Sequence, residues 1–172
     1  MSILVAYFSR AGQNYGNGGV INLAKGNTEV LAEAIAQALG ADLFKIDTAE
    51  PYPADYFATT DQAKRELREK ARPAIVGPLP SMTGVDHIVL GYPNWWGTVP
   101  MAVKTFLDSV DLAGVTIAPL CTNEGSGLGG SVGDLRRSYP DATVLDGLSV
   151  RGTDAARSTG KAVDWARRAI EG

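Results

Sequence analysis

The sequence predicts an α/β fold, a three-layer sandwich in which helices cover both faces of a five-stranded parallel sheet. Short, continuous apolar runs, typical of strands buried on both faces, recur along the chain. They alternate with stretches whose apolar residues repeat at helical spacing. This alternation is typical of parallel strands joined by helical crossovers. Since no linker or internal repeat interrupts the pattern, we expect a single domain over residues 1–172.

The first half of the chain contains two expected strands and two expected helices. They are a strand at 3–8, a helix at 28–39 closed by Gly40, a strand at 43–46 and a charged helix from about 56 to 72. Pro51 and Pro53 break the chain before the charged helix. Three further prolines, Pro73, Pro78 and Pro80, indicate a long connection to the next strand.

The second half continues the alternation. The expected strands are 88–90, 115–120 and 143–145. Thr98 and Pro100 predict the start of a helix that carries Met101, Val103, Phe106 and Leu107. A short helix bearing Leu128, Val132 and Leu135 follows the glycine-rich segment, and Thr153-Asp154 is expected to cap a last helix bearing Val163, Ala166 and Ile170.

Composition excludes several classes of protein. The net charge is −3 and there is no run of basic residues, which argues against a nucleic-acid partner. The one cysteine, Cys121, and the one histidine, His87, leave no internal disulfide and no multi-histidine metal site. We expect both to be structural. The apolar run at 3–8 is too short for a membrane span or signal peptide, so a cytoplasmic location is expected.

Functional residues are expected in the loops that follow strands, because ligands of such sheets bind beyond the carboxyl ends of the strands. After the first strand, Ser9-Arg10 and Gly26-Asn27-Thr28 flank a helix N-terminus. Backbone N–H groups, the helix dipole and hydroxyl donors there predict a site for one phosphate. No lysine of a triphosphate-binding loop follows. The intervening stretch Ala11–Lys25 can be interpreted either as part of this site or as a surface excursion.

The loop after the third strand, Tyr92–Gly97, contains two of the three tryptophans. Such rings favour stacking or edge contact with a planar heteroaromatic ligand. In the alternative interpretation, one tryptophan caps the core and the other packs on the neighbouring helix. The loop after the fourth strand, Thr122–Gly127, offers polar backbone with little bulk and could line the edge of the same ligand.

A dinucleotide-binding fingerprint is a competing interpretation of this third loop. Gly125, Gly127 and Gly130 have the required spacing, and Asp146 follows the next strand. The match lies late in the chain, however, with one strand left to complete a dinucleotide crevice. The dinucleotide interpretation is therefore disfavoured.

Together, the Ser9-Arg10 and Gly26-Asn27-Thr28 segments and the Tyr-Pro-Asn-Trp-Trp-Gly loop at 92–97 resemble the flavodoxin family over nearly the whole chain. The resemblance implies a flavodoxin-like sheet in the order 2-1-3-4-5 that binds one FMN non-covalently. It implies FMN contacts, without catalytic residues or metal ligands, at Ser9, Arg10, Gly26, Asn27, Thr28, Tyr92, Pro93, Asn94, Trp95, Trp96, Gly97, Thr122, Asn123, Glu124, Gly125 and Ser126.

The expected function is that of a flavodoxin-type redox protein, which transfers electrons through bound FMN to a redox partner protein or a small-molecule acceptor. One alternative is an oxidoreductase resembling NAD(P)H-dependent FMN quinone reductases. Another is a non-catalytic flavin-binding module. The mild net charge and the extra segment Ala11–Lys25 lean slightly toward the reductase. Peptide N–H groups at 94–97 are expected to bond the flavin ring, and Gly97 is expected to let that loop respond to redox state. Both a monomer and a homodimer fit.

Overall fold

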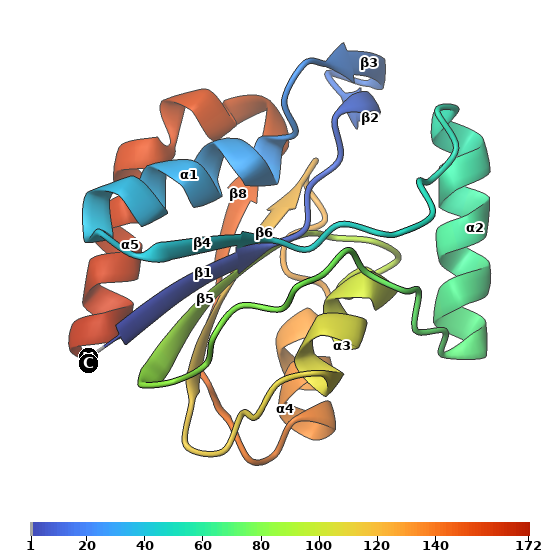
Figure 1. The fold of residues 1–172 in the computed structure, drawn as a ribbon. Coiled ribbons are helices and arrows are strands. Elements are labelled where there is room, and N and C mark those ends of the chain that lie inside the picture. The colour runs from blue at the N-terminus through green and yellow to red at the C-terminus, as the bar shows by residue number, and fades with distance from the viewer. Residues whose placement is uncertain (1) are drawn as a thin grey trace.

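A parallel sheet lies at the centre of the protein, whose computed structural model describes residues 2–172 (Figure 1). The strands are β1 (Ser2–Tyr7), β4 (Asp42–Lys45), β5 (Val85–Pro93), β6 (Thr116–Asn123), β7 (Thr143–Val144) and β8 (Leu148–Arg151). They lie in the order β4-β1-β5-β6-β7, and β8 also pairs with β6. Counted along the chain without the separate hairpin described below, this is the order 2-1-3-4-5, so the predicted topology is confirmed.

The fifth position of the sheet is shared by two short strands. β7 pairs with β6 at Thr116 and Ile117, whereas β8 pairs with residues 120–123 of β6. The interruption falls beside Pro119, which has no backbone N–H to donate. Gly147 lies so close that a Cβ there would be 2.9 Å from the Pro119 carbonyl oxygen. The strand predicted at 143–145 is therefore only the first half of the fifth position, and β8 extends it to the functional edge of the sheet.

Two helices cover each face of the sheet. Helices α1 (Asn27–Leu39) and α5 (Thr159–Glu171) lie on one face, and α3 (Met101–Asp108) and α4 (Ser131–Ser138) on the other (Figure 1). Alternate residues of β1 enter the two cores: Val5 packs in the cluster with α1 and α5, and Leu4 in the cluster with α3 and α4. This two-residue period explains why the strand reads as a continuous apolar run.

Helix α2 (Tyr56–Glu69) stands apart from the two helical layers (Figure 1). Only Thr59 and Ala63 of this helix are buried, consistent with its charged sequence. The Asp55 carboxylate accepts a hydrogen bond from the Ala58 N–H and caps its first turn. The helix ends at Glu69, slightly before the predicted end at 72, and Lys70 caps it in a left-handed conformation with φ 51°.

The stretch 11–25 forms a β-hairpin that projects from the sheet edge (Figure 1). Its strands are β2 (Gly12–Gly16) and β3 (Gly19–Leu23). The two turn residues, Asn17 and Gly18, have φ values of 52° and 81°, as a type I′ turn requires. The Asn-Gly pair is a strong hairpin signal, and the expectation of an irregular excursion overlooked it.

The predicted cap of the last helix is wrong. Residues Thr153 and Asp154 lie in a 3-10 helix, η1 (Gly152–Arg157), and α5 begins at Thr159. The Thr153 N–H donates to the Glu124 carboxylate at 2.9 Å, which fixes this turn against the loop after β6. Asp154 pairs instead with Arg157. Within residues 2–172, no helix combines the length and the apolar character that crossing a membrane requires.

Candidate functional site

The three polar loops predicted from the sequence meet at one edge of the sheet. They follow β1, β5 and β6, which are parallel neighbours, so their carboxyl ends lie side by side. The N–H of Asn94 donates to the Thr122 carbonyl oxygen at 2.9 Å and joins the second loop to the third. The Thr28 and Thr122 hydroxyl oxygens lie 2.8 Å apart and join the first loop to the third.

The hairpin does not separate the two halves of the first loop. A Cβ on Gly26 would lie 2.1 Å from Ser9 Oγ and 2.7 Å from the Arg10 carbonyl oxygen, so only glycine fits there. Ser9 Oγ accepts a hydrogen bond from the Glu29 N–H at 3.1 Å. In the described chain this leaves the N–H groups of Asn27 and Thr28 without an acceptor at the N-terminus of α1. Such an arrangement suits an anion.

The Arg10 guanidinium donates its hydrogen bonds to backbone carbonyl groups outside the predicted phosphate site. Its Nε donates to the Gln13 carbonyl oxygen at 2.8 Å, and its Nη2 donates to those of Pro53 and Ala54 at 2.9 and 3.0 Å. Burial lowers the pKa of the guanidinium, against the opposing effect of Asp55. Arg10 therefore braces the hairpin against the segment before α2, and this geometry gives no support to its predicted role as a phosphate ligand.

The second loop contains a tight turn with an unusual backbone. Trp96 and Gly97 have φ values of 56° and 87°, and Trp95 and Thr98 pair across the turn. The left-handed conformation costs a residue with a side chain about 1–2 kcal/mol. Two hydrogen bonds hold it: the Trp96 indole donates to the Thr60 carbonyl oxygen at 2.9 Å, and the Gly97 N–H to Asn94 Oδ1 at 2.8 Å.

The two tryptophans have different surroundings. The Trp95 ring packs edge-on against Phe8 and Tyr52, with centroids 5.0 and 5.1 Å away. The Trp96 ring is half exposed and rests beside α2, with Lys64 Nζ 5.0 Å from its centroid. Their packing thus matches the alternative interpretation, with α2 as the helix. Both rings nevertheless line a cavity, so core packing does not account for all of their surface.

Tyr92 does not present its side chain to this edge. The ring is fully buried among the residues under α3 and α4, and its hydroxyl lies 2.8 Å from Ser131 Oγ. Burial raises the pKa of the phenol. Only the backbone of Tyr92 reaches the loop. Its predicted place among the cofactor contacts came from its neighbours in the sequence, and local spacing could not tell that the ring turns into the core.

The third loop is organised by side-chain amides. Asn123 Oδ1 accepts from the N–H groups of Gly125 and Gly127, both at 2.9 Å. From the second loop, Asn94 Nδ2 donates to the Gly127 carbonyl oxygen at 2.9 Å. The Glu124 carboxylate accepts from the Thr153 N–H and therefore links this loop to η1.

The glycine fingerprint at 125–130 serves the packing of the two loops. The Gly130 N–H donates to the Gly97 carbonyl oxygen at 2.8 Å. A Cβ on Gly129 would lie 2.7 Å from that same oxygen. Of the fingerprint glycines, Gly125 and Gly127 adopt φ values of 116° and 68°, which gives them a structural reason that requires no dinucleotide.

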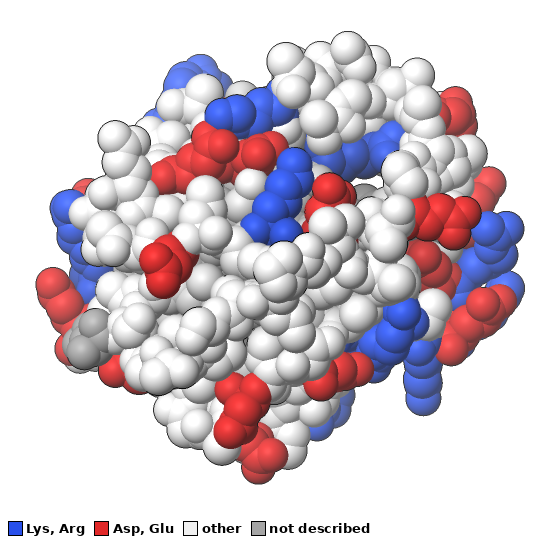
Figure 2. Space-filling view, in the orientation of Figure 1, with Lys and Arg blue, Asp and Glu red and all other residues white. Residues whose placement is uncertain are grey.

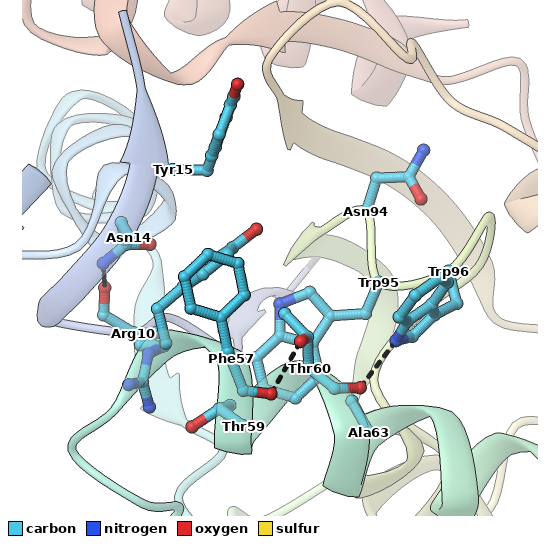
Figure 3. Close-up of a pocket in the computed structure, with 11 residues that line it drawn as sticks. Arg10, Asn14, Tyr15, Phe57, Thr59, Thr60, Ala63, Asn94, Trp95 and Trp96 are labelled. Carbon is cyan, nitrogen blue, oxygen red and sulfur yellow. Dashed lines mark hydrogen bonds between the residues drawn. The ribbon is translucent and has the colours of Figure 1, made fainter. Parts of the chain in front are cut away.

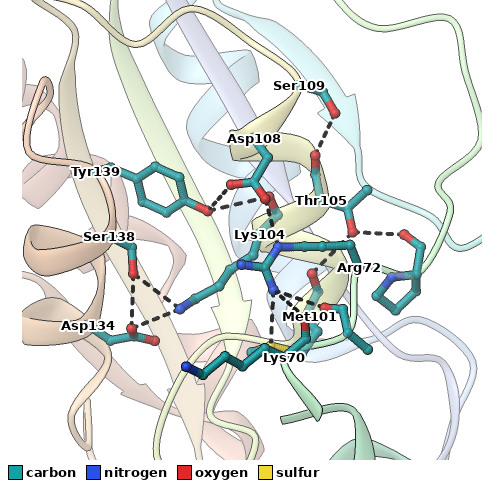
Figure 4. Close-up of polar contacts among 12 residues, drawn as sticks. Lys70, Arg72, Met101, Lys104, Thr105, Asp108, Ser109, Asp134, Ser138 and Tyr139 are labelled. Atoms are coloured by element: carbon teal, nitrogen blue, oxygen red, sulfur yellow. Dashed lines mark hydrogen bonds and ion pairs between the residues drawn. The ribbon is translucent and has the colours of Figure 1, made fainter.

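A polar cluster that includes Lys104, Asp134 and Ser138 joins α3 to α4 (Figure 4). Lys104, although buried, donates from Nζ to Asp134 Oδ1 at 2.8 Å. The other oxygen of Asp134 accepts from the Thr98 hydroxyl, at the end of the Trp96-Gly97 turn. Burial alone would raise the pKa of Asp134, but the hydrogen bonds from Lys104, Thr98 and Ser138 outweigh it and lower the pKa.

Two adjoining cavities lie at this edge. The first, of about 220 Å³, is called the loop cavity and draws residues from all three predicted loops. It is lined by Asn14, Tyr15, Asn27, Tyr56, Pro93, Asn94, Trp95, Thr122, Asn123, Glu124, Ser126 and Gly152. Ser9, Arg10, Gly26 and Thr28 do not line it. The predicted residues Trp96, Gly97 and Gly125 also lie outside its lining, in the adjacent turns.

The second, of about 450 Å³, is called the aromatic cavity and lies between the hairpin, α2 and the second loop (Figure 3). It is lined by Arg10, Asn14, Tyr15, Tyr56, Phe57, Thr59, Thr60, Ala63, Asn94, Trp95 and Trp96. The residues from the hairpin and α2 were missed by the sequence analysis. The Asn17-Gly18 signal could have located the hairpin, but the weak apolar pattern of α2 gave no indication of what this helix faces.

The family model described as Flavodoxin matches residues 2–166. Among solved structures, the chain resembles a candidate flavoprotein of Bacteroides uniformis at 28% identity, covering 96% of this chain and 97% of that one with a TM-score of 0.77. It resembles one of Bacteroides eggerthii at 30% identity, covering 95% and 98% with a TM-score of 0.71. A Lactobacillus acidophilus flavoprotein in complex with FMN is 20% identical, with coverage of 91% and 97% and a TM-score of 0.68. No curated protein sequence matches.

Proposed function

Because the chain belongs to the flavodoxin family, we propose that it is a redox protein that binds one FMN non-covalently and transfers electrons through it. The observation that carries this proposal is the loop cavity, in which three loops far apart in the sequence converge at the carboxyl edge of the sheet. FMN is the cofactor that family membership supports, and the Lactobacillus acidophilus relative is an FMN complex. We also propose that residues 1–172 form one domain.

The first loop fits the phosphate of FMN. The absence of a Cβ at Gly26 lets the chain close around Ser9, and the N–H groups of Asn27 and Thr28, in the first turn of α1, have no acceptor within residues 2–172. The helix dipole favours an anion at this place. Since Arg10 is directed to backbone carbonyl groups, we propose that neutral donors hold the phosphate.

The second loop leaves one peptide N–H for the flavin ring. The N–H groups of Asn94, Trp95 and Gly97 already donate to Thr122 O, Thr98 O and Asn94 Oδ1, respectively. Of the four N–H groups at 94–97, only that of Trp96 has no acceptor among residues 2–172. We therefore narrow the expected contact from the whole 94–97 segment to the Trp96 peptide group, which the turn holds in place.

FMN, when bound, supplies the capacity to accept and release electrons, and the protein tunes its potential through contacts and nearby charge. Glu124 is the one acidic residue of the loop cavity. Its carboxylate is occupied by the Thr153 N–H and by Arg151, 3.5 Å away. This pairing reduces the negative potential that Glu124 would otherwise impose on the bound ring.

The aromatic cavity favours the second candidate function, a reductase that delivers electrons to a small molecule. An electron carrier that serves only another protein has no need of a second cavity beside its cofactor. Here the hairpin and α2 enclose one of about 450 Å³, within the usual size of small-molecule sites. A non-catalytic flavin module remains the third candidate, and electron-transfer measurements separate it from the other two.

The test of the proposed function is the visible absorption spectrum of the purified protein. We expect flavin bands, and release of FMN on denaturation. Anaerobic reduction in small steps and an assay of NAD(P)H oxidation then separate carrier from reductase. Protein that takes up FMN but exchanges no electrons would favour the binding module. Colourless protein that cannot be reconstituted with FMN would refute the proposal.

A further inference from the structure

The aromatic cavity adjoins the loop cavity without duplicating it. The two share Asn94 and Trp95 from the second loop, together with Asn14, Tyr15 and Tyr56. Asn27 from the first loop and the third-loop residues, among them Thr122, line the loop cavity alone, whereas Arg10 from the first loop lines the aromatic cavity. In contrast, the far wall of the aromatic cavity is α2, from Tyr56 to Ala63 (Figure 3). The space is therefore additional to the three loops proposed to hold FMN.

Five of the eleven residues that line this cavity are aromatic. Phe57, Trp96 and Tyr15 are 63%, 50% and 45% exposed, although each is a large apolar side chain. Tyr15 and Tyr56 face each other with their ring centroids 6.2 Å apart and their planes inclined by 33°. Clustered exposed rings around a hollow are typical of a ligand-binding surface. Their flat faces suit a flat, aromatic ligand.

The charges around the cavity disfavour a cationic ligand. Among residues 2–172, no Asp or Glu lines it, and Arg10 is its one charged lining residue. Arg10 forms its hydrogen bonds with backbone carbonyl groups, and within residues 2–172 no carboxylate lies within ion-pair distance of it. Lys64 adds a second positive charge over the Trp96 ring at 5.0 Å. Asp55, at the start of α2, offsets part of this charge, but with Arg10 and Lys64 against one carboxylate the local potential favours neutral or anionic molecules. The face seen in Figure 2 otherwise carries both signs of charge interspersed.

We propose that the aromatic cavity binds a flat molecule of one or two fused aromatic rings that carries no positive charge, while FMN occupies the loop cavity. The proposal that the cavity binds such a molecule depends only on the cavity walls described above. The further step, that this molecule is the substrate of a reductase, rests on the proposed function. The hairpin contributes to this cavity: it supplies Tyr15, and its Gln13 side chain accepts a hydrogen bond from the Tyr56 N–H at the start of α2.

The experiment is calorimetric titration of oxidised, FMN-loaded protein with 2-naphthoate, a flat two-ring anion that is not an electron acceptor. N-Methylquinolinium, of similar size but positively charged, is the matched probe. Phe57→Ala removes an exposed ring of the rim while retaining a good helix former in α2. Leu43→Ala is the control, because Leu43 is also exposed (44%) but lines neither cavity.

We expect wild-type protein to bind one 2-naphthoate, and N-methylquinolinium at least about tenfold more weakly because of the positive potential. Phe57→Ala should raise the dissociation constant for 2-naphthoate about fivefold or more through loss of stacking. The dissociation constant for FMN should stay nearly constant in Phe57→Ala. Leu43→Ala should change neither the dissociation constant for 2-naphthoate nor that for FMN.

Three results would overturn the inference: no 2-naphthoate binding to protein that retains FMN, no effect of Phe57→Ala, or mutual displacement of 2-naphthoate and FMN. The last result would mean that the cavity belongs to the cofactor site. Failure of the proposed function would look different, because protein unable to take up FMN could still bind 2-naphthoate with the same sensitivity to Phe57→Ala.

Discussion

The hydroxyl oxygens of Thr28 and Thr122 lie 2.8 Å apart, in a buried pair that joins the start of α1 to the end of β6. In such a pair one hydroxyl donates and the other keeps its hydrogen available for a further acceptor. The contact therefore couples the proposed phosphate site to the loop proposed to border the flavin ring. Substitutions at either threonine should affect both ligand binding and stability.

Removal of the two hydroxyls of the first loop should discriminate between flavins. We expect Ser9→Ala combined with Thr28→Ala to weaken FMN at least about tenfold more than riboflavin, because hydrogen bonds to a charged group contribute about 1.5–3 kcal/mol. Fluorescence titration of both flavins measures this. Thr122→Val is the matched control, since it also breaks the threonine pair but should weaken both flavins alike. Equal losses for FMN and riboflavin in the double variant would reject the phosphate assignment.

Arg10→Ala tests whether Arg10 is a brace or a phosphate ligand. Its donors bond Gln13, Pro53 and Ala54, so we expect loss of the side chain to loosen the hairpin and the start of α2. Amide hydrogen exchange should accelerate in α2, while the ratio of FMN to riboflavin affinity stays constant. A selective loss of FMN affinity would restore the role predicted from the sequence.

The Trp96-Gly97 turn should be sensitive to a side chain at its second position. Gly97 has a φ of 87°, and we expect Gly97→Ala to lower the free energy of unfolding by about 1–2 kcal/mol. Gly160→Ala, in α5, meets no atom within 4 Å and should instead raise it by about 0.5–1 kcal/mol. Chemical denaturation measures both, and equal effects would contradict the assigned backbone strain.

The same turn should respond to the redox state of the cofactor. The Trp96 peptide group is proposed to contact the ring, and Gly97 permits backbone conformations closed to other residues. Crystal structures of the oxidised and reduced protein should therefore differ between residues 94 and 98. Identical backbones in the two states would contradict this prediction.

Asp134 should contribute to stability in a pH-dependent manner. Since its folded pKa is lowered, its contribution is present above its unfolded pKa of about 4 and is lost as the pH falls through the folded value. Asp134→Asn should flatten the acid limb of the stability curve. At neutral pH it should cost roughly 2–3 kcal/mol, because buried Lys104 loses its partner.

The control for Asp134 is Asp146→Asn. The Asp146 side chain pairs with Arg136 but is 98% exposed, so its loss should leave the pH profile almost unchanged. Thermal unfolding between pH 3 and 7 compares the two variants. Similar pH profiles for both variants would show that the Lys104–Asp134 pair contributes no more to the pH dependence of stability than an exposed ion pair does.

The alternation of apolar runs and helical stripes determined the fold, because each depends only on residues that are near one another in the sequence. The strand at residues 3–8 and the helix at 28–39 were predicted almost to the residue for this reason. The placement of the three polar loops at one edge followed from parallel topology alone. The Asn17-Gly18 turn was equally local and could have been predicted.

Tertiary structure alone decided which groups face the site. Arg10 meets Pro53, Trp96 meets Thr60, and Glu124 meets Thr153, contacts that span dozens of residues. No local spacing encodes such partners, because they depend on how the hairpin, α2 and η1 settle against the sheet. The sequence therefore predicted which loops would form the proposed flavin site, whereas packing decided that Tyr92 would enter the core and that α2 would enclose a second cavity.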